Sequence, residues 1–83
     1  MSAIPFGQIL REVRKRAGIR QAELADIIEV SQPYISFLET GKRYPNIYDV
    51  EDMAAYLGAS PQETRAMCES LVSAGYFVKV EPS

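Results

Sequence analysis

Two helical stretches of this chain follow one another so closely that they must meet at a steep angle. The first covers about residues 21–28 and the second about 32–40, so roughly three residues connect them. Ser31 offers a good N-terminal cap for the second helix. Pro33 then falls in the first turn, where the N–H that proline lacks would have no partner within the helix. So short a connection forces a sharp crossing of the two helices.

Start and stop signals in the rest of the chain predict further helices. These cover about residues 6–17, 47–57 and 61–74. The segment SPQE at 60–63 has the serine, proline and glutamate of a strong helix start. Strand-forming residues follow at 76–80. The pattern predicts an all-α fold of five helices with a short C-terminal strand or extended tail.

Each predicted helix has an apolar stripe that should face the core. In chain order the stripes contain Phe6, Ile9, Leu10, Val13 and Ala17; Ala22, Leu24, Ala25 and Ile28; Ile35 and Leu38; Ile47, Val50, Met53, Ala54 and Leu57; and Met67, Leu71 and Ala74. By the same pattern, Ile27 should be exposed.

Length and composition predict a small domain without covalent staples. With 83 residues, we expect one domain over 1–75 and a tail over 76–83. Cys68 is the only cysteine and there is no histidine, so neither an internal disulfide nor a metal site is expected. We expect no cofactor. Stability must come from helix packing, a partner subunit or both.

The chain has no basic N-terminal segment followed by an apolar run, and no apolar run approaches the ~20 residues of a membrane span. We therefore expect a cytoplasmic protein without membrane association. Its net charge of −2 is unevenly distributed, because residues 1–43 carry seven Lys/Arg against five Asp/Glu and residues 44–83 carry two against six. This asymmetry hints at an anionic partner for the first half.

The stretch RKRAGIRQAELADIIEVSQPYISFLETGKRYP resembles the phage-repressor type of helix-turn-helix, the Cro-like or xenobiotic-response-element family. The likeness covers roughly residues 6–58. Its markers are Gly18, the QxxLA block that starts at Gln21, the VSxxxIS block over 30–36, and Glu39-x-Gly41 followed by Pro45. The resemblance implies a lambda-repressor-like fold whose helix at 32–40 enters the major groove of DNA.

The same resemblance implies roles for individual residues. Base contacts fall on Gln32, Pro33, Ser36 and Phe37, and phosphate contacts fall on Arg20, Gln21, Tyr34, Lys42 and Arg43. It also implies a structural ion pair between Arg14 and Glu39.

Several of these roles have alternatives. Pro33 could merely space the helix, Ser36 could bond a phosphate, and Tyr34 could pack partly in the core. Phe37 could touch thymine methyl groups or fold back towards Tyr44. Lys42 and Arg43 could be solvated loop charges.

Two residues depart from the family pattern. Arg20 stands where a Ser or Thr cap is common, so the cap is lost and a cation is gained. Glu29 stands where glycine is common, and a positive φ there would cost Glu about 1–2 kcal/mol. Three further cations, Arg11, Lys15 and Arg16, are expected to coat the first helix.

The leading hypothesis is a repressor-like, sequence-specific regulator that binds double-stranded DNA as a homodimer on an inverted repeat. The predicted dimer elements are the last helix and the tail residues Tyr76, Phe77, Val78 and Val80, although the tail could instead fold back on its own domain. The alternative is a protein-interaction module on the same fold: an antitoxin, anti-repressor or adaptor. An enzyme is not expected, because the chain has no histidine and no glycine-rich phosphate loop, and Cys68 has no visible base.

Overall fold

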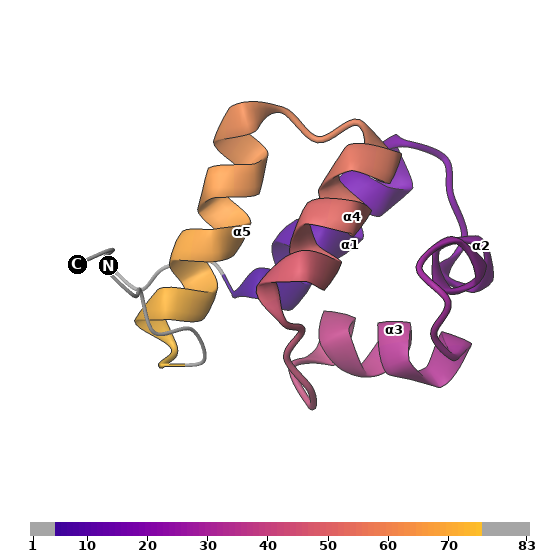
Figure 1. Ribbon diagram of the computed structural model, residues 1–83, viewed down its shortest axis with the longest axis horizontal. Coiled ribbons are helices and arrows are strands. Elements are labelled where there is room, and N and C mark those ends of the chain that lie inside the picture. The colour runs from indigo at the N-terminus through magenta and orange to yellow at the C-terminus, as the bar shows by residue number, and fades with distance from the viewer. Residues whose placement is uncertain (1–4, 76–83) are drawn as a thin grey trace.

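The computed structural model describes residues 5–75 of the chain, which form five helices and no strand (Figure 1). The helices are α1 (Phe6–Arg16), α2 (Gln21–Ile27), α3 (Gln32–Thr40), α4 (Ile47–Leu57) and α5 (Pro61–Ser73). The prediction of an all-α fold is confirmed, and each predicted boundary lies within one residue of the observed one. The strand predicted at 76–80 lies outside the described residues.

Local capping chemistry fixes where most of these helices begin. The side chains of Ser31, Asn46 and Ser60 each accept a hydrogen bond from the backbone N–H three residues later. Glu63 returns the bond to the backbone N–H of Ser60 at 2.8 Å, which completes the predicted capping box. Pro33 lies in the first turn of α3, as expected.

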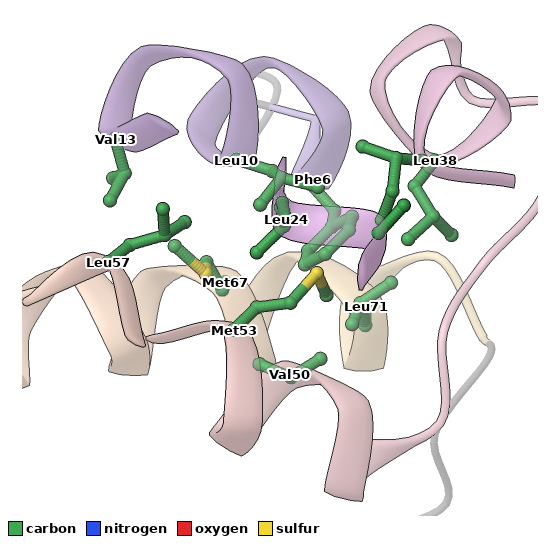
Figure 2. Packing of buried hydrophobic residues seen from close by; sticks show 12 residues of the cluster. Phe6, Leu10, Val13, Leu24, Leu38, Val50, Met53, Leu57, Met67 and Leu71 are labelled. Carbon is green, nitrogen blue, oxygen red and sulfur yellow. The ribbon is translucent and has the colours of Figure 1, made fainter. Parts of the chain in front are cut away.

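The core is formed where α1 and α4 meet α5 and where α1 and α2 meet α3 (Figure 2). It contains Phe6, Leu10, Val13, Leu24, Ala25, Ile35, Leu38, Val50, Met53, Leu57, Met67 and Leu71. Most of the predicted stripes are therefore confirmed. Ile9 and Ile28 are half-buried and pack against this core, as does Cys68. The side chain of Ile47 lies outside what the structure describes.

Three alanines predicted to be buried are exposed instead: Ala17, Ala22 and Ala74. Ala17 and Ala74 are the C-terminal caps of α1 and α5, each directly before a glycine of positive φ at which the chain leaves the helix. Ala22 lies in the first turn of α2, beside the exposed Arg20 and Glu23. The apolar stripes of these helices therefore stop short of the helix ends at these three alanines.

Gly7 allows α1 to approach the end of α3 closely. A Cβ atom at Gly7 would lie 2.5 Å from the carbonyl oxygen of Leu38, and closer still to that of Glu39. Both are backbone atoms, which cannot rotate away as the end of a side chain would. Glycine is therefore required for the observed α1–α3 distance.

A second link joins α1 to α5 at the surface. The Arg16 guanidinium bonds both carboxylate oxygens of Glu63, from Nη1 to Oε2 and, at 2.7 Å, from Nη2 to Oε1. The bonds from Arg16 and from the Ser60 backbone lower the pKa of Glu63 from its ordinary 4.5 to about 2. The same carboxylate, through its hydrogen bond and its charge, raises the pKa of Arg16. Arg16 thus does more than coat α1.

We predict that Gly7→Ala destabilises the fold by about 1–3 kcal/mol, because the added methyl forces α1 and α3 apart. At an ordinary helix position the same change would stabilise by up to ~1 kcal/mol, so the sign of the effect is diagnostic. Chemical denaturation measures it. Gln8→Ala, at an exposed neighbouring position, is the control and should stay within about 0.5 kcal/mol. A Gly7→Ala protein as stable as wild type would contradict the packing argument.

We also predict that Glu63 contributes to acid unfolding. Its folded pKa lies below its unfolded one, so its contribution is present above about pH 4.5 and is lost as the pH falls towards 2. Melting temperatures of wild type and Glu63→Gln should therefore differ near neutral pH and converge near pH 2. Arg16→Gln should remove only the part that depends on Arg16, because the bond from the Ser60 backbone to Glu63 remains. A constant gap between wild type and Glu63→Gln at all pH values would exclude this origin.

Candidate nucleic-acid interface

Helix α3 lies along one edge of the molecule, across the ends of α1 and α4, with α2 beside it (Figure 1). Ile35 and Leu38 point into the core, as predicted. The residues that face away are the exposed Gln32, Pro33, Phe37 and Thr40 and the half-buried Ser36. The side chains predicted to contact bases therefore lie together on one outer face.

The turn between α2 and α3 contains a strained residue. Glu29 has a φ of 60° and is the only non-glycine residue with positive φ among those described. The backbone N–H of Val30 donates to the carbonyl oxygen of Ala25 at 2.9 Å, which closes the turn after the helix end. Next to it, Ile27 is 49% exposed, as predicted.

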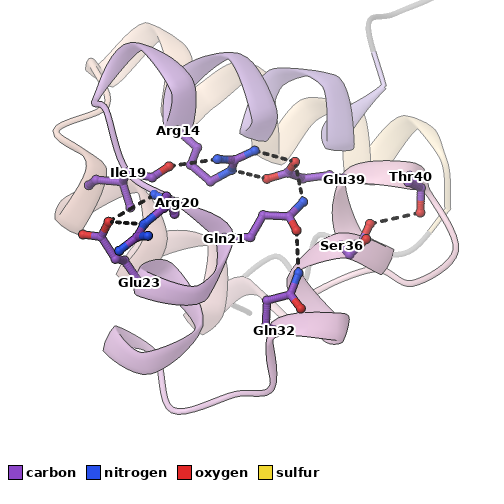
Figure 3. Close-up of polar contacts among 9 residues, drawn as sticks. All are labelled: Arg14, Ile19, Arg20, Gln21, Glu23, Gln32, Ser36, Glu39 and Thr40. Carbon is purple, nitrogen blue, oxygen red and sulfur yellow. Dashed lines mark hydrogen bonds and ion pairs between the residues drawn. The ribbon is translucent and has the colours of Figure 1, made fainter.

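A buried ion pair fixes α3 against α1 (Figure 3). Arg14 Nε lies 2.5 Å from Glu39 Oε2, and Arg14 Nη2 donates to Glu39 Oε1 at 3.0 Å. Their side chains are only 10% and 4% exposed. A third bond, from Arg14 Nη1 to the carbonyl oxygen of Ile19 at 2.8 Å, attaches the segment that leads into α2. One guanidinium thus connects three elements of the fold.

Two glutamines extend this ion pair to the surface. Gln21 Nε2 donates to Glu39 Oε1 at 3.0 Å, and Gln32 Nε2 donates to Gln21 Oε1 at 2.7 Å (Figure 3). The side chain at the start of α3 is therefore held, through Gln21, by a buried carboxylate. This arrangement orients the Gln32 amide in the free protein.

Arg20 lies at the start of α2 with most of its side chain exposed. Its side chain is 86% exposed and pairs with Glu23 at 3.3 Å. Glu23 also accepts from the Arg20 backbone N–H at 3.5 Å, whereas the Arg20 side chain has no acceptor atom and makes no cap bond. An exposed pair of this kind contributes under about 1 kcal/mol, so another anion could readily draw Arg20 away.

Tyr34 is half-buried and packs against the core. Its hydroxyl donates to Asp49 Oδ2 at 3.4 Å. Burial, followed by the charge and hydrogen bond of Asp49, raises the pKa of Tyr34. A phosphate would have to compete with Asp49 for this hydroxyl proton.

Phe37, Lys42 and Arg43 come together at the end of α3. The backbone N–H groups of Lys42 and Arg43 donate to the carbonyl oxygen of Phe37 at 2.9 and 3.2 Å, after Gly41 turns the chain with a φ of 82°. Lys42 Nζ lies 5.9 Å from the centroid of the Phe37 ring. Phe37 is 37% exposed and outside the core cluster, whereas Tyr44 packs against that cluster.

The predicted dimer residues Tyr76, Phe77, Val78 and Val80 lie outside the described part of the chain. Gly7 and Asp49 both position α3, and neither was predicted from the sequence. A glycine within an otherwise helical apolar pattern was the available signal for Gly7. For Asp49 there was none, because its contact with Tyr34 spans two helices.

We predict that Glu39→Ala costs about 3–5 kcal/mol, because it leaves Arg14 as an uncompensated buried cation. The melting temperature should fall by roughly 12 °C or more, at about 4–8 °C per kcal/mol for a domain of this size. Glu51→Ala, which removes an exposed acid of α4, is the control.

Replacing both partners, as Arg14→Met with Glu39→Leu, should recover much of the loss, since no buried charge remains. If Glu39→Ala melted like wild type, α3 would not depend on this pair.

Similarity to known proteins agrees with this geometry. The family described as "Helix-turn-helix domain" matches residues 5–67, which include α1 to α4 and the start of α5. The HTH-type transcriptional regulator DdrOP3 of Deinococcus deserti is 35% identical over 49 residues, which are 59% of this chain and 38% of that regulator. This chain therefore spans well under half of that relative. No helix within residues 5–75 is long and apolar enough to cross a membrane. With α2 and α3 crossing over a short turn and the match covering 63 of 83 residues, the chain belongs to the helix-turn-helix domain family.

Proposed function

We propose that the chain binds double-stranded DNA and regulates transcription as a repressor, with α3 in the major groove. The observation that carries this is the chain of hydrogen bonds from Arg14 through Glu39 and Gln21 to Gln32, which presents the N-terminal end of α3 in a fixed orientation. In helix-turn-helix proteins this end of the second helix contacts base edges. The name of the relative from Deinococcus deserti, a transcriptional regulator, supports the same function.

Gln32 is the proposed reader of adenine. Its amide has two N–H donors and one carbonyl acceptor, and the bond to Gln21 uses one donor. The other N–H and the carbonyl oxygen remain, which is the pair that a bidentate contact with adenine N7 and N6 requires. Pro33, Ser36 and Phe37 continue the contact surface along the outer face of α3.

Phosphate contacts fall on both sides of that face. Arg20 and Gln21 precede it at the start of α2, and Lys42 and Arg43 follow it after α3. Tyr34 joins them only if its hydroxyl leaves Asp49. Cations in these places position the helix and supply much of the affinity.

A homodimer on an inverted repeat completes the proposal, because two α3 helices must reach half-sites about one turn of DNA apart. Val72, 45% exposed on α5, supports an interface at the end of the chain. The residues proposed to extend it are Tyr76, Phe77, Val78 and Val80.

The first test is selection of bound duplexes from a random pool, at about 50 and 200 mM salt. We expect an inverted repeat with half-site centres about ten base pairs apart. Six proposed cations per dimer imply a slope near −5, so affinity should fall about a thousandfold between the two salts.

Two variants separate the proposed roles on the selected duplex. Gln32→Ala should relax the preference at one base pair per half-site, at a cost of about 1–3 kcal/mol. Arg20→Ala should weaken all duplexes alike and reduce the salt slope by roughly one per protomer. Equal effects of both variants on every duplex would refute base recognition by Gln32.

One observation favours a second function, as a protein-interaction module such as an antitoxin, anti-repressor or adaptor. Ile27 and the α4 residue Tyr48 are large apolar or aromatic side chains left 49% and 74% exposed. Folded protein that enriches no duplex at either salt would favour this function over the first.

A further inference from the structure

The outer face of α3 carries a hollow that is lined by both polar and apolar side chains. Ser31, Pro33, Tyr34, Phe37 and Arg43 line this hollow, which has a volume of about 230 Å³. Sites that enclose a small-molecule ligand usually have about 300–1,000 Å³. The hollow therefore suits a small group that projects from a larger surface.

Phe37 and Pro33 provide the apolar wall of the hollow. They lie four residues apart on one helix, so their side chains are neighbours on the same face. Lys42 Nζ lies 5.9 Å from the centroid of the Phe37 ring, within the range of a cation–π interaction. The ring does not belong to the core cluster, so its exposed part remains available to a partner.

The surroundings of the hollow limit what that partner can be. Arg43 lines it and Lys42 adjoins it, so an anionic backbone can lie against its rim. In the major groove, base edges present donors and acceptors and a single kind of apolar group, the methyl on C5 of thymine. The thymine methyl lies in a groove that is bordered on both sides by phosphate backbones. The hollow is bordered by two cations, Arg43 and Lys42, whose charge is opposite to that of the phosphates.

We propose that Phe37 and Pro33 form a specificity site for the C5-methyl group of a major-groove pyrimidine. This inference rests on the proposed DNA-binding function and names one group that the site recognises. Thymine and 5-methylcytosine both carry the methyl, whereas uracil and cytosine lack it. The hollow therefore distinguishes methylated from unmethylated pyrimidines at one position of each half-site.

The test uses the full chain and the duplex obtained by selection. Each thymine is replaced in turn by deoxyuridine, which removes the methyl and leaves the base pairing intact. At one position per half-site we expect wild type to bind about fourfold more weakly, the value for losing one buried methyl-sized group. Phe37→Ala should bind the two duplexes equally, and Phe37→Leu should keep part of the difference.

Arg20→Ala is the matched control. Its side chain lies at the start of α2, away from the hollow, so binding should weaken by the same factor on the thymine and uracil duplexes. A second pair of duplexes carries cytosine or 5-methylcytosine opposite guanine at the sensitive position. If wild type binds the 5-methylcytosine duplex more tightly, the hollow recognises the C5-methyl group on either pyrimidine. If only the thymine and uracil duplexes differ in affinity, the hollow recognises thymine alone.

The outcomes separate this inference from the function on which it rests. Specific binding with equal affinity for thymine and uracil at every position would overturn the methyl site and leave the DNA-binding function in place. An unchanged methyl effect in Phe37→Ala would also overturn it. Absence of any specifically bound duplex would remove both.

Discussion

The ion pair between Arg14 and Glu39 is the interaction on which the arrangement of the other functional parts depends. Arg14 extends from α1, and its guanidinium also bonds the carbonyl oxygen of Ile19 before α2, while Glu39 extends from the end of α3. An uncompensated charge at this depth would cost several kcal/mol, so the two side chains must remain together. Their pairing fixes α2 and α3 relative to α1, and through Gln21 it reaches the surface at Gln32.

Close backbone contact makes this pairing possible. Gly7 brings α1 against the carbonyl groups of Leu38 and Glu39, so the Glu39 side chain starts near α1. The turn at Glu29 holds the other end of the motif in a conformation that glycine would adopt at lower cost. The backbone positions that least tolerate substitution or strain, Gly7 and Glu29, therefore both lie next to α3.

The sequence predicted local features of this protein better than contacts between helices. Caps, proline positions and the apolar stripes predicted the positions of the helices correctly, because each of these signals depends on residues that lie within three or four positions of one another. Likeness to a family that often has glycine at position 29 raised the question of a positive φ at Glu29, and only the structure answered it. Asp49 as the partner of Tyr34, and Glu63 as the partner of Arg16, could not be predicted, because neither contact follows from helical spacing. The orientation of Phe37 also required the structure, since helical spacing fits either a groove-facing or a folded-back ring.

Charge explains how a chain of net charge −2 can still suit DNA. Arg14 is buried with Glu39, and Arg16 is paired with Glu63, so two cations of the first half serve the fold itself. Of the other cations, Arg20 directly precedes α2, and Lys42 and Arg43 follow α3 after Gly41. Few phosphate contacts mean modest affinity for DNA of arbitrary sequence. Discrimination must then come from the groups that α3 presents to base edges, which is where the fold places its fixed amide and its exposed aromatic ring.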